Sequence, residues 1–229
     1  MQQSRPTTSP TTSFWLHALF ALAIGIWLRV HGFAAQIPIS DEWHGLQAAA
    51  QESYLRLATL MTAGATSIPY NLYLRWLLHE VGWSEWTIRL PALAAGIATV
   101  ALAPLLLRRT IGARGAALTG VLLAISPLLV LYSRYARPYS LVVLLALVAL
   151  LACHRWATTG SRRAAVALVA ACALAAWLHV LEIRLFALCL GAVAAARLVA
   201  PRWPALAVAP SWRAIAGVAL AGALAIAAL

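Results

Sequence analysis

The chain has 229 residues, of which 63% are hydrophobic and only 10% are charged, and its mean hydropathy is +0.85. A soluble domain carries about 25% charged residues, so this composition excludes an ordinary soluble protein. The net charge is +11, and every basic residue apart from histidine is arginine. These arginines stand at the ends of apolar runs and form no single patch, which argues against nucleic-acid binding. The cysteines, which lie in apolar runs without metal-ligand spacing, predict neither a disulfide framework nor a zinc site: Cys153, Cys172 and Cys189.

The first 13 residues, rich in Ser, Thr and Pro, are expected to form a flexible tail before an apolar run at 14–28. Gly32 and Ala34 leave a cleaved signal peptide as an alternative, although the spans that follow favour an uncleaved first helix. A bilayer core of about 30 Å requires roughly 20 apolar residues, and several runs approach this length. Residues 14–229 are therefore predicted to form an all-α, polytopic membrane module with about seven transmembrane helices. The later runs are 90–107, 116–132, 139–153, 164–178, 185–198 and 212–229.

Arginine groups fall on alternate loops, and the positive-inside rule predicts that these loops and the N-terminus are cytoplasmic. The protein is then expected in a bacterial cytoplasmic membrane, and the long connection 32–88 faces outward with five of the six acidic residues. Arg134 and Arg137 break the rule because they occupy a short outward turn. The predicted cytoplasmic arginines are Arg5, Arg108, Arg109, Arg114, Arg155, Arg162, Arg163, Arg197 and Arg202.

The outward connection is predicted to contain two amphipathic helices lying along the membrane surface. The first begins after Ser40, a plausible N-cap, and the second runs from about Pro69 to Val81 before Gly82. Ser84 is expected to cap the next helix. The apolar face of the first helix is predicted from its spacing: Trp43, Leu46, Ala50, Tyr54, Leu57 and Met61. The residues expected to be solvated, to hold the outer helices together or to anchor them at the interface are Arg75, Trp76, His79, Glu80, Trp83, Glu85, Trp86 and Arg89.

Asp41 and Glu42 come directly after the first span, at a predicted helix start on the outward side. Acidic side chains there stabilise the helix dipole by about 0.3–1 kcal/mol, which is a sufficient structural reason for them. A general base at the membrane surface, with a pKa tuned by partial burial, explains them equally well.

The segment from Arg134 to Tyr139 places two arginines among tyrosines in one outward turn. One guanidinium group can donate two parallel hydrogen bonds to the oxygens of a phosphate, so this turn is a candidate site for a phosphate at lipid headgroup depth. The alternative is that Arg134 and Arg137 simply reach ordinary headgroups. A second ionisable group, His179 with Glu182 and Arg184, lies at the next outward turn and is either functional or a local salt bridge.

Together these segments resemble the GT-C superfamily of membrane glycosyltransferases, in particular the branch of dolichyl-phosphate-mannose protein mannosyltransferases and lipid A aminoarabinose transferases. The resemblance is carried by four pieces: Ser40-Asp41-Glu42, the stretch from Pro69 through Arg89 to Pro91, the stretch from Ser133 to Tyr139, and Trp177-Leu178-His179.

The resemblance implies transfer of a sugar from a polyprenyl-phosphate donor to a glycan, lipid or protein acceptor, with inversion at the anomeric carbon. Asp41, with Glu42 beside it, would be the catalytic pair, and Asp41 would deprotonate the acceptor. Arg137, together with Arg134, would hold the donor phosphate, and Tyr139 and His179 would complete the substrate site. No cofactor is implied beyond the donor itself, and use of a divalent metal stays open.

Two departures from the family pattern bear on function. Ser67-Ile68-Pro69 stands where family members often have His-Pro-Pro, and the chain is much shorter than they usually are, ending inside an apolar run at Leu229. We therefore expect either a glycosyltransferase, complete or missing spans that a second chain supplies, or a non-catalytic membrane subunit that binds a lipid phosphate or a partner. A transporter is disfavoured because its ionisable residues would lie near the bilayer midplane.

Overall fold

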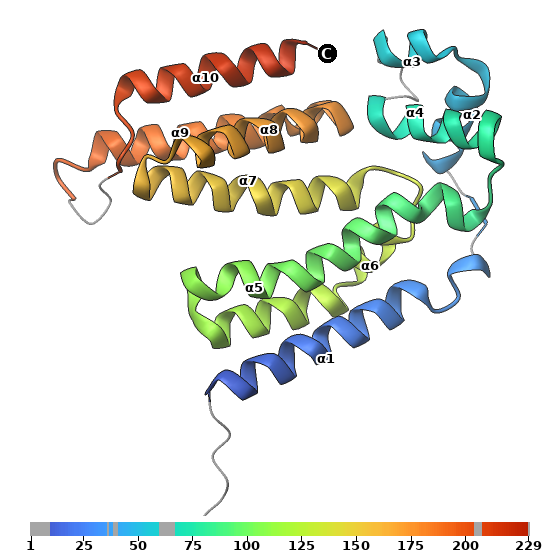
Figure 1. Ribbon diagram of the computed structural model, residues 1–229, viewed down its shortest axis with the longest axis horizontal. Helices are drawn as coiled ribbons and strands as arrows, with labels where there is room; N and C mark the ends of the chain where they lie inside the picture. The colour runs from blue at the N-terminus through green and yellow to red at the C-terminus, as the bar shows by residue number, and fades with distance from the viewer. Residues whose placement is uncertain (1–9, 36, 39–40, 60–66, 204–207, 229) are drawn as a thin grey trace, which may run out of the picture.

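The computed structural model describes residues 10–35, 37–38, 41–59, 67–203 and 208–228. Every regular element in these ranges is a helix, which confirms the predicted all-α class. Figure 1 shows the long helices running side by side, with α2, α3 and α4 gathered at one end. The elements are α1 (Pro10–Val30), η1 (Phe33–Ala35), α2 (Asp41–Gln51), α3 (Tyr54–Thr59), α4 (Ile68–Trp76), η2 (Leu77–Val81), α5 (Glu85–Ile125), α6 (Pro127–Ser133), α7 (Tyr139–Thr159), α8 (Arg162–Leu178), η3 (Val180–Glu182), α9 (Ile183–Val199) and α10 (Trp212–Ala227).

Three of the described helices are long and apolar enough to cross a membrane: Ser13–Val30 within α1, the 41-residue α5, and α7. The predicted runs at 164–178 and 185–198 lie in α8 and α9, which have 17 residues each, and the last run lies in α10. The structure thus confirms a polytopic membrane protein, while the total of about seven spans stays a prediction. The predicted tail 1–13 is too long, because α1 already begins at Pro10, and residues 1–9 lie outside the described part of the chain.

Helix α5 is one element by hydrogen bonding but bends sharply at Gly112, whose φ of 77° and ψ of 167° are not helical. This residue turns the chain back, so the two predicted runs at 90–107 and 116–132 lie in the two arms of α5 and in α6. The second arm ends at Ser126, and Pro127 begins α6.

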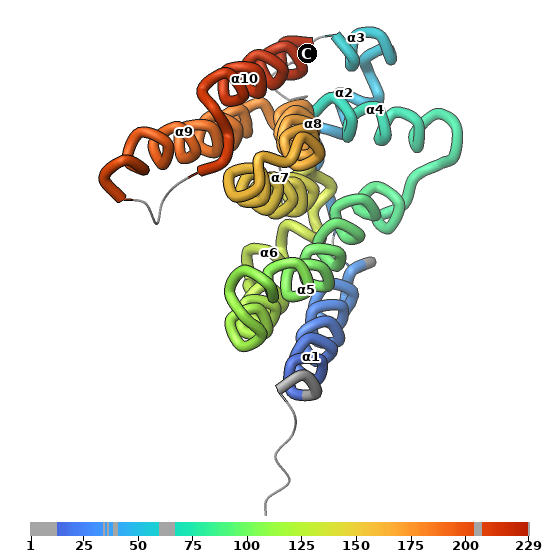
Figure 2. The backbone as a smooth tube through the Cα atoms, turned by 60° about the vertical axis from the view of Figure 1, so that its left-hand side comes forward, coloured from blue at the N-terminus to red at the C-terminus, as the bar shows by residue number. Residues whose placement is uncertain are grey.

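The long helices form two packed groups, which are separated clearly in Figure 2. In one group α1 packs along α5, and Ala21, Val100 and Ala124 are buried between them. In the other group α7, α8, α9 and α10 share a core that includes Trp156 and Leu168. Contacts between α5 and α7 join the two groups.

The connection 32–88 forms a helical cap over the ends of α5, α7 and α8 (Figure 1). Leu46, Tyr70 and Leu74 are buried together with Ile88 at the start of α5 and Leu178 at the end of α8. Ser84 caps α5 by accepting a hydrogen bond from the Thr87 backbone N–H, as the sequence predicts. The predicted second outer helix is present as α4 and continues as one π-helical turn, η2, which ends at Gly82.

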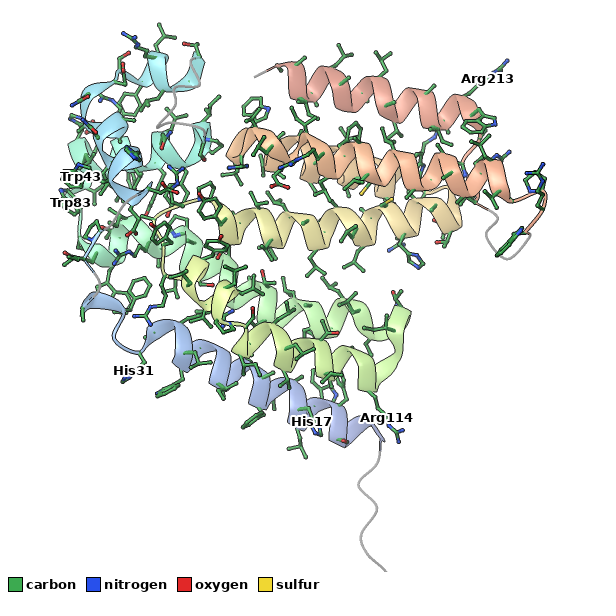
Figure 3. All side chains as sticks on the ribbon, turned by 180° about the vertical axis from the view of Figure 1, so that it is seen from behind. His17, His31, Trp43, Trp83, Arg114 and Arg213 are labelled. Atoms are coloured by element: carbon green, nitrogen blue, oxygen red, sulfur yellow. The ribbon has the colours of Figure 1, made fainter. Side chains whose placement is uncertain are left out.

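The expected first outer helix is wrong in two respects. The chain breaks at Ser53 into α2 and α3, and the buried face of α2 consists of Glu42, Gly45, Leu46 and Ala49, while Trp43 and Ala50 are exposed. The reason is that burial of the Glu42 carboxylate turns the helix away from the face that its apolar side chains predict. Ser40 and Met61 lie outside the described residues. Trp43 and Trp83 point away from the cap (Figure 3), as interfacial anchors do.

Candidate active site

The cap is locked to the membrane helices by an ion pair between Glu42 and Arg89. Both side chains are fully buried, and Arg89 donates two hydrogen bonds to the carboxylate, from Nε to Oε1 at 2.7 Å and from Nη2 to Oε2 at 2.9 Å. The backbone N–H of Ala136 also donates to Oε1, at 2.6 Å. One carboxylate thus joins α2, α5 and the turn 134–138. The sequence predicts that Arg89 is either solvated or holds the outer helices together, and the structure shows that it holds α2.

Asp41 is adjacent in sequence to Glu42 but has a different environment. Its side chain is half-buried, and the Tyr139 hydroxyl donates to Asp41 Oδ2 at 3.3 Å, a long and therefore weak hydrogen bond. Successive residues in a helix point about 100° apart, so burial of Glu42 leaves Asp41 on the edge of the cap. Of the two carboxylates predicted to be catalytic, Asp41 is the one that a substrate can approach.

The two arginines of the turn 134–138 point to different parts of the site. Arg134 Nη2 donates to the Gly32 carbonyl oxygen at 2.9 Å, which ties the turn to the end of α1. Its Nε is enclosed and has no hydrogen-bond partner. The Arg137 guanidinium carbon lies 5.9 Å from the centre of the Tyr139 ring, whose hydroxyl donates to Asp41. The structure therefore places Arg137 beside the ring of Tyr139, whereas Arg134 is tied to Gly32.

Tyrosines around the cap lie in a partly dehydrated and negative environment. Burial is the main cause that raises the pKa of Tyr135, and the nearby negative charges of Glu42 and Asp41 raise it further. Burial also raises the pKa of Tyr70, whose hydroxyl donates to the Ile88 carbonyl oxygen at 2.8 Å. Both phenols therefore stay protonated, and can donate a hydrogen bond, at a higher pH than an ordinary tyrosine.

Tyr139 lies at the centre of the candidate site. The centre of its ring is 4.7 Å from that of Tyr132 and 6.0 Å from that of His179. His179 directly follows the last turn of α8. His179 Nδ1 lies 3.9 Å from Glu182 Oε1 and makes no hydrogen bond. The alternative of a local salt bridge between Glu182 and Arg184 is not seen: Arg184 Nε donates to the Leu181 carbonyl oxygen, and Glu182 lies beside His179.

Arg29, a buried arginine to which the sequence analysis gave no function, helps to hold the turn 134–138 in place. Arg29 is 1% exposed, and its guanidinium donates to the carbonyl oxygens of Gly25, Leu123 and Ala124 at 3.0–3.1 Å. These carbonyls belong to the C-terminal turns of α1 and α5, where helix dipoles favour a cation. Its Nε donates to Ser133 Oγ at 3.1 Å, so Arg29 also fixes the residue that precedes the arginine turn.

A sequence signal for Arg29 did exist. If the first span runs outward, then Arg29 lies at its outward end and departs from the positive-inside rule as Arg134 and Arg137 do. An arginine that closes an apolar run is, however, most simply read as a membrane flank, and only the structure shows its carbonyl partners.

The assembled site can take up a proton and hold an anion at one place. Asp41 supplies an accessible carboxylate, Arg137 a cation and His179 a second titratable group, all around the ring of Tyr139. Within the described residues no three His, Cys, Asp or Glu side chains are placed to hold a metal ion together. The geometry thus fits acid–base chemistry beside a bound phosphate.

Comparison with known families identifies the family of the chain. A family model described as dolichyl-phosphate-mannose-protein mannosyltransferase matches residues 66–221 of the chain. The match includes Arg89, the arginine turn and His179 but begins after Asp41, and it confirms the resemblance found in the sequence. Searches of curated proteins and of solved structures found no match.

Proposed function

The chain belongs to the dolichyl-phosphate-mannose-protein mannosyltransferase family, and we propose that it transfers a sugar from a polyprenyl-phosphate donor to an acceptor beside the α2–α4 cap. We place this face on the outside of a bacterial cytoplasmic membrane, and the acceptor is a glycan, a lipid or a protein. The observation that carries the proposal is the half-buried Asp41 carboxylate next to Tyr139, with Arg137 close to the same ring. Family membership alone gives a membrane glycosyltransferase, and this geometry supports the proposal of Asp41 as the base and Arg137 as the phosphate-binding residue.

The reaction assigns one task to each residue. Asp41 accepts the proton of the acceptor hydroxyl, and the acceptor oxygen attacks the anomeric carbon from the face opposite the phosphate. The bond between that carbon and the phosphate oxygen breaks, and its electron pair leaves with the polyprenyl phosphate. Arg137 stabilises the charge that develops on the leaving phosphate. A single displacement of this kind inverts the anomeric configuration and needs no covalent enzyme intermediate.

The other site residues position this pair. Glu42 and Arg89 fix the start of α2 and thereby Asp41, while the Ala136 N–H bond to Glu42 fixes the turn that carries Arg137. Tyr139 and His179 lie near each other, with ring centres 6.0 Å apart, and are proposed to contact the donor.

The test compares the purified full chain with its Asp41→Asn variant, using a panel of polyprenyl-phosphate sugars. We expect Asp41→Asn to bind polyprenyl phosphate as the wild type does and to lose about 10²–10⁴-fold in turnover, the usual contribution of a general base. We expect Arg137→Gln to weaken binding of the lipid phosphate. Assays with Mg²⁺ and with a chelator decide whether the reaction uses a divalent cation.

Glu52→Gln is the matched control, because Glu52 is an acidic residue of the same cap whose partner Arg56 is exposed. Turnover at the wild-type rate in Asp41→Asn would rule out Asp41 as the base. Binding of polyprenyl phosphate that depends on Arg137, without turnover of any donor by the wild type, would favour the alternative of a non-catalytic or partial subunit.

A further inference from the structure

A cavity lies far from the candidate site, between the beginning of α1 and the second arm of α5. Its volume is about 630 Å³, within the range of about 300–1,000 Å³ that small-molecule sites occupy. His17 and Arg114, labelled in Figure 3, lie at this corner, at the end of the long helices opposite the α2–α4 cap. Neither the family match nor the proposed glycosyl transfer gives this cavity a role.

The cavity has a cationic end and an apolar wall. Arg114 is exposed at its rim, and Arg108 lies close by, with its guanidinium carbon 4.6 Å from the centre of the Phe14 ring. His17 Nδ1 lies 2.6 Å from the Ser13 carbonyl oxygen, so that nitrogen donates and the other ring nitrogen remains as a polar atom of the site. The rest of the lining consists of apolar side chains, mainly Ala117, Leu118 and Val121.

We propose that this cavity binds an acidic phospholipid, with its phosphate at Arg114 and one acyl chain along Ala117, Leu118 and Val121. Both helices that form the cavity are long and apolar enough to cross the membrane, so its apolar part opens toward lipid tails. Leu118 is 60% exposed, as expected for a side chain that faces lipid. The arginines stand beside the Gly112 corner, where the helices reach the headgroup layer and a guanidinium can pair with phosphate.

A soluble anion fits these observations less well. It would use the arginine but would leave most of the apolar wall uncovered, whereas a phospholipid covers both. The proposal therefore commits to a lipid, and a soluble anion becomes an outcome of the test.

The experiment reconstitutes the full chain in nanodiscs of equal parts phosphatidylglycerol and phosphatidylcholine and counts the lipids retained after release by native mass spectrometry. We expect the wild type to retain phosphatidylglycerol preferentially. Arg114→Gln should reduce this preference about fivefold, the effect of one arginine near an anionic headgroup. Arg109→Gln is the matched control, because Arg109 is exposed in the same turn and does not line the cavity.

A third variant, Leu118→Trp, tests the apolar wall with all charges kept. It should lower retention of phosphatidylglycerol by filling the path of the acyl chain, at a position exposed enough to accept the larger side chain. Equal losses in Arg114→Gln and Arg109→Gln would show only a diffuse basic surface and overturn the proposal. Displacement of the retained lipid by inorganic phosphate, or unchanged retention in Leu118→Trp, would also overturn it.

Discussion

Two neighbouring carboxylates, Asp41 and Glu42, have opposite physical settings. Glu42 is fully buried and accepts hydrogen bonds from Arg89 and from the Ala136 N–H, while Asp41 is half-buried and accepts a long hydrogen bond from Tyr139. A charge that is removed from water must be compensated by its partners, which is the situation of Glu42. Adjacent positions in a helix thus separate a structural carboxylate from one that can exchange a proton.

The burial of Glu42 with Arg89 predicts a large interaction energy between the two side chains, measured as the free energy of unfolding. Glu42→Gln leaves the Arg89 guanidinium buried without its counter-charge, so we expect a loss of about 3–5 kcal/mol in the free energy of unfolding. In Glu42→Gln/Arg89→Met the stranded charge is gone, and the glutamine oxygen can still accept from Ala136, so most of the loss should be recovered. Unfolding of each variant in a detergent titration measures the effect. Additive losses in the double variant would contradict a coupled pair.

At this scale, sequence reasoning found the residues that meet around Tyr139 but not the roles of all of them. Arg137 and His179 were recognised because ionisable groups in outward turns are costly and need a reason. The paired role of Glu42 was missed because nothing in the sequence relates position 42 to position 89. Arg29 was missed for the same reason: its partners are backbone carbonyls of a distant helix, which have no side-chain signature.

Among the elements, α5 depends on a single glycine for its path. Gly112 has φ 77° and ψ 167°, a conformation open essentially only to glycine, and a Cβ added there would meet no atom within 4 Å. Gly112→Ala should therefore lose about 1–3 kcal/mol from backbone strain alone. Gly115, three residues on, lies in the helix, and a Cβ there makes only ordinary contacts with Ile111. Gly115→Ala should gain about 0.5–1 kcal/mol.

The paired glycine variants are informative because they make the same chemical change. Thermal unfolding of both in one detergent gives the sign of each effect directly. A loss of stability in Gly115→Ala as large as that in Gly112→Ala would show that crowding, and not the backbone angle, decides.

Helix existence was easier to predict than helix faces. Each predicted apolar run falls on described helices, although 90–107 and the first part of 116–132 share α5 and the rest of 116–132 lies in α6, because bilayer-length hydrophobicity dominates the local sequence. The face of α2 was predicted wrongly because the pattern gave weight to Trp43, which is exposed, and none to Glu42, which is buried. Apolar periodicity predicts a buried face only where burial is driven by apolar side chains, and here a buried ion pair sets it.

For the whole molecule, the distribution of charge sets the expected orientation in the membrane. The connection 32–88, which includes the α2–α4 cap, holds five of the six acidic residues, and the Gly112 corner at the other end of α5 holds a group of arginines. Positive charge is retained on the cytoplasmic side, so the cap and the candidate site should face outward. The native cysteines are all buried, so they give little background in a labelling experiment: Cys153, Cys172 and Cys189.

Single introduced cysteines test this orientation. A membrane-impermeant maleimide should label Arg56→Cys, at an exposed position of α3, in intact cells. Arg109→Cys, at the exposed Gly112 corner, should be labelled only after the membrane is opened, because α3 lies at the end of α5 opposite the Gly112 bend (Figure 1). The reverse labelling pattern would place Asp41 and Arg137 on the cytoplasmic side, where the acceptor would have to be cytoplasmic. Labelling of both positions in intact cells would contradict any arrangement in which α5 crosses the bilayer once before Gly112.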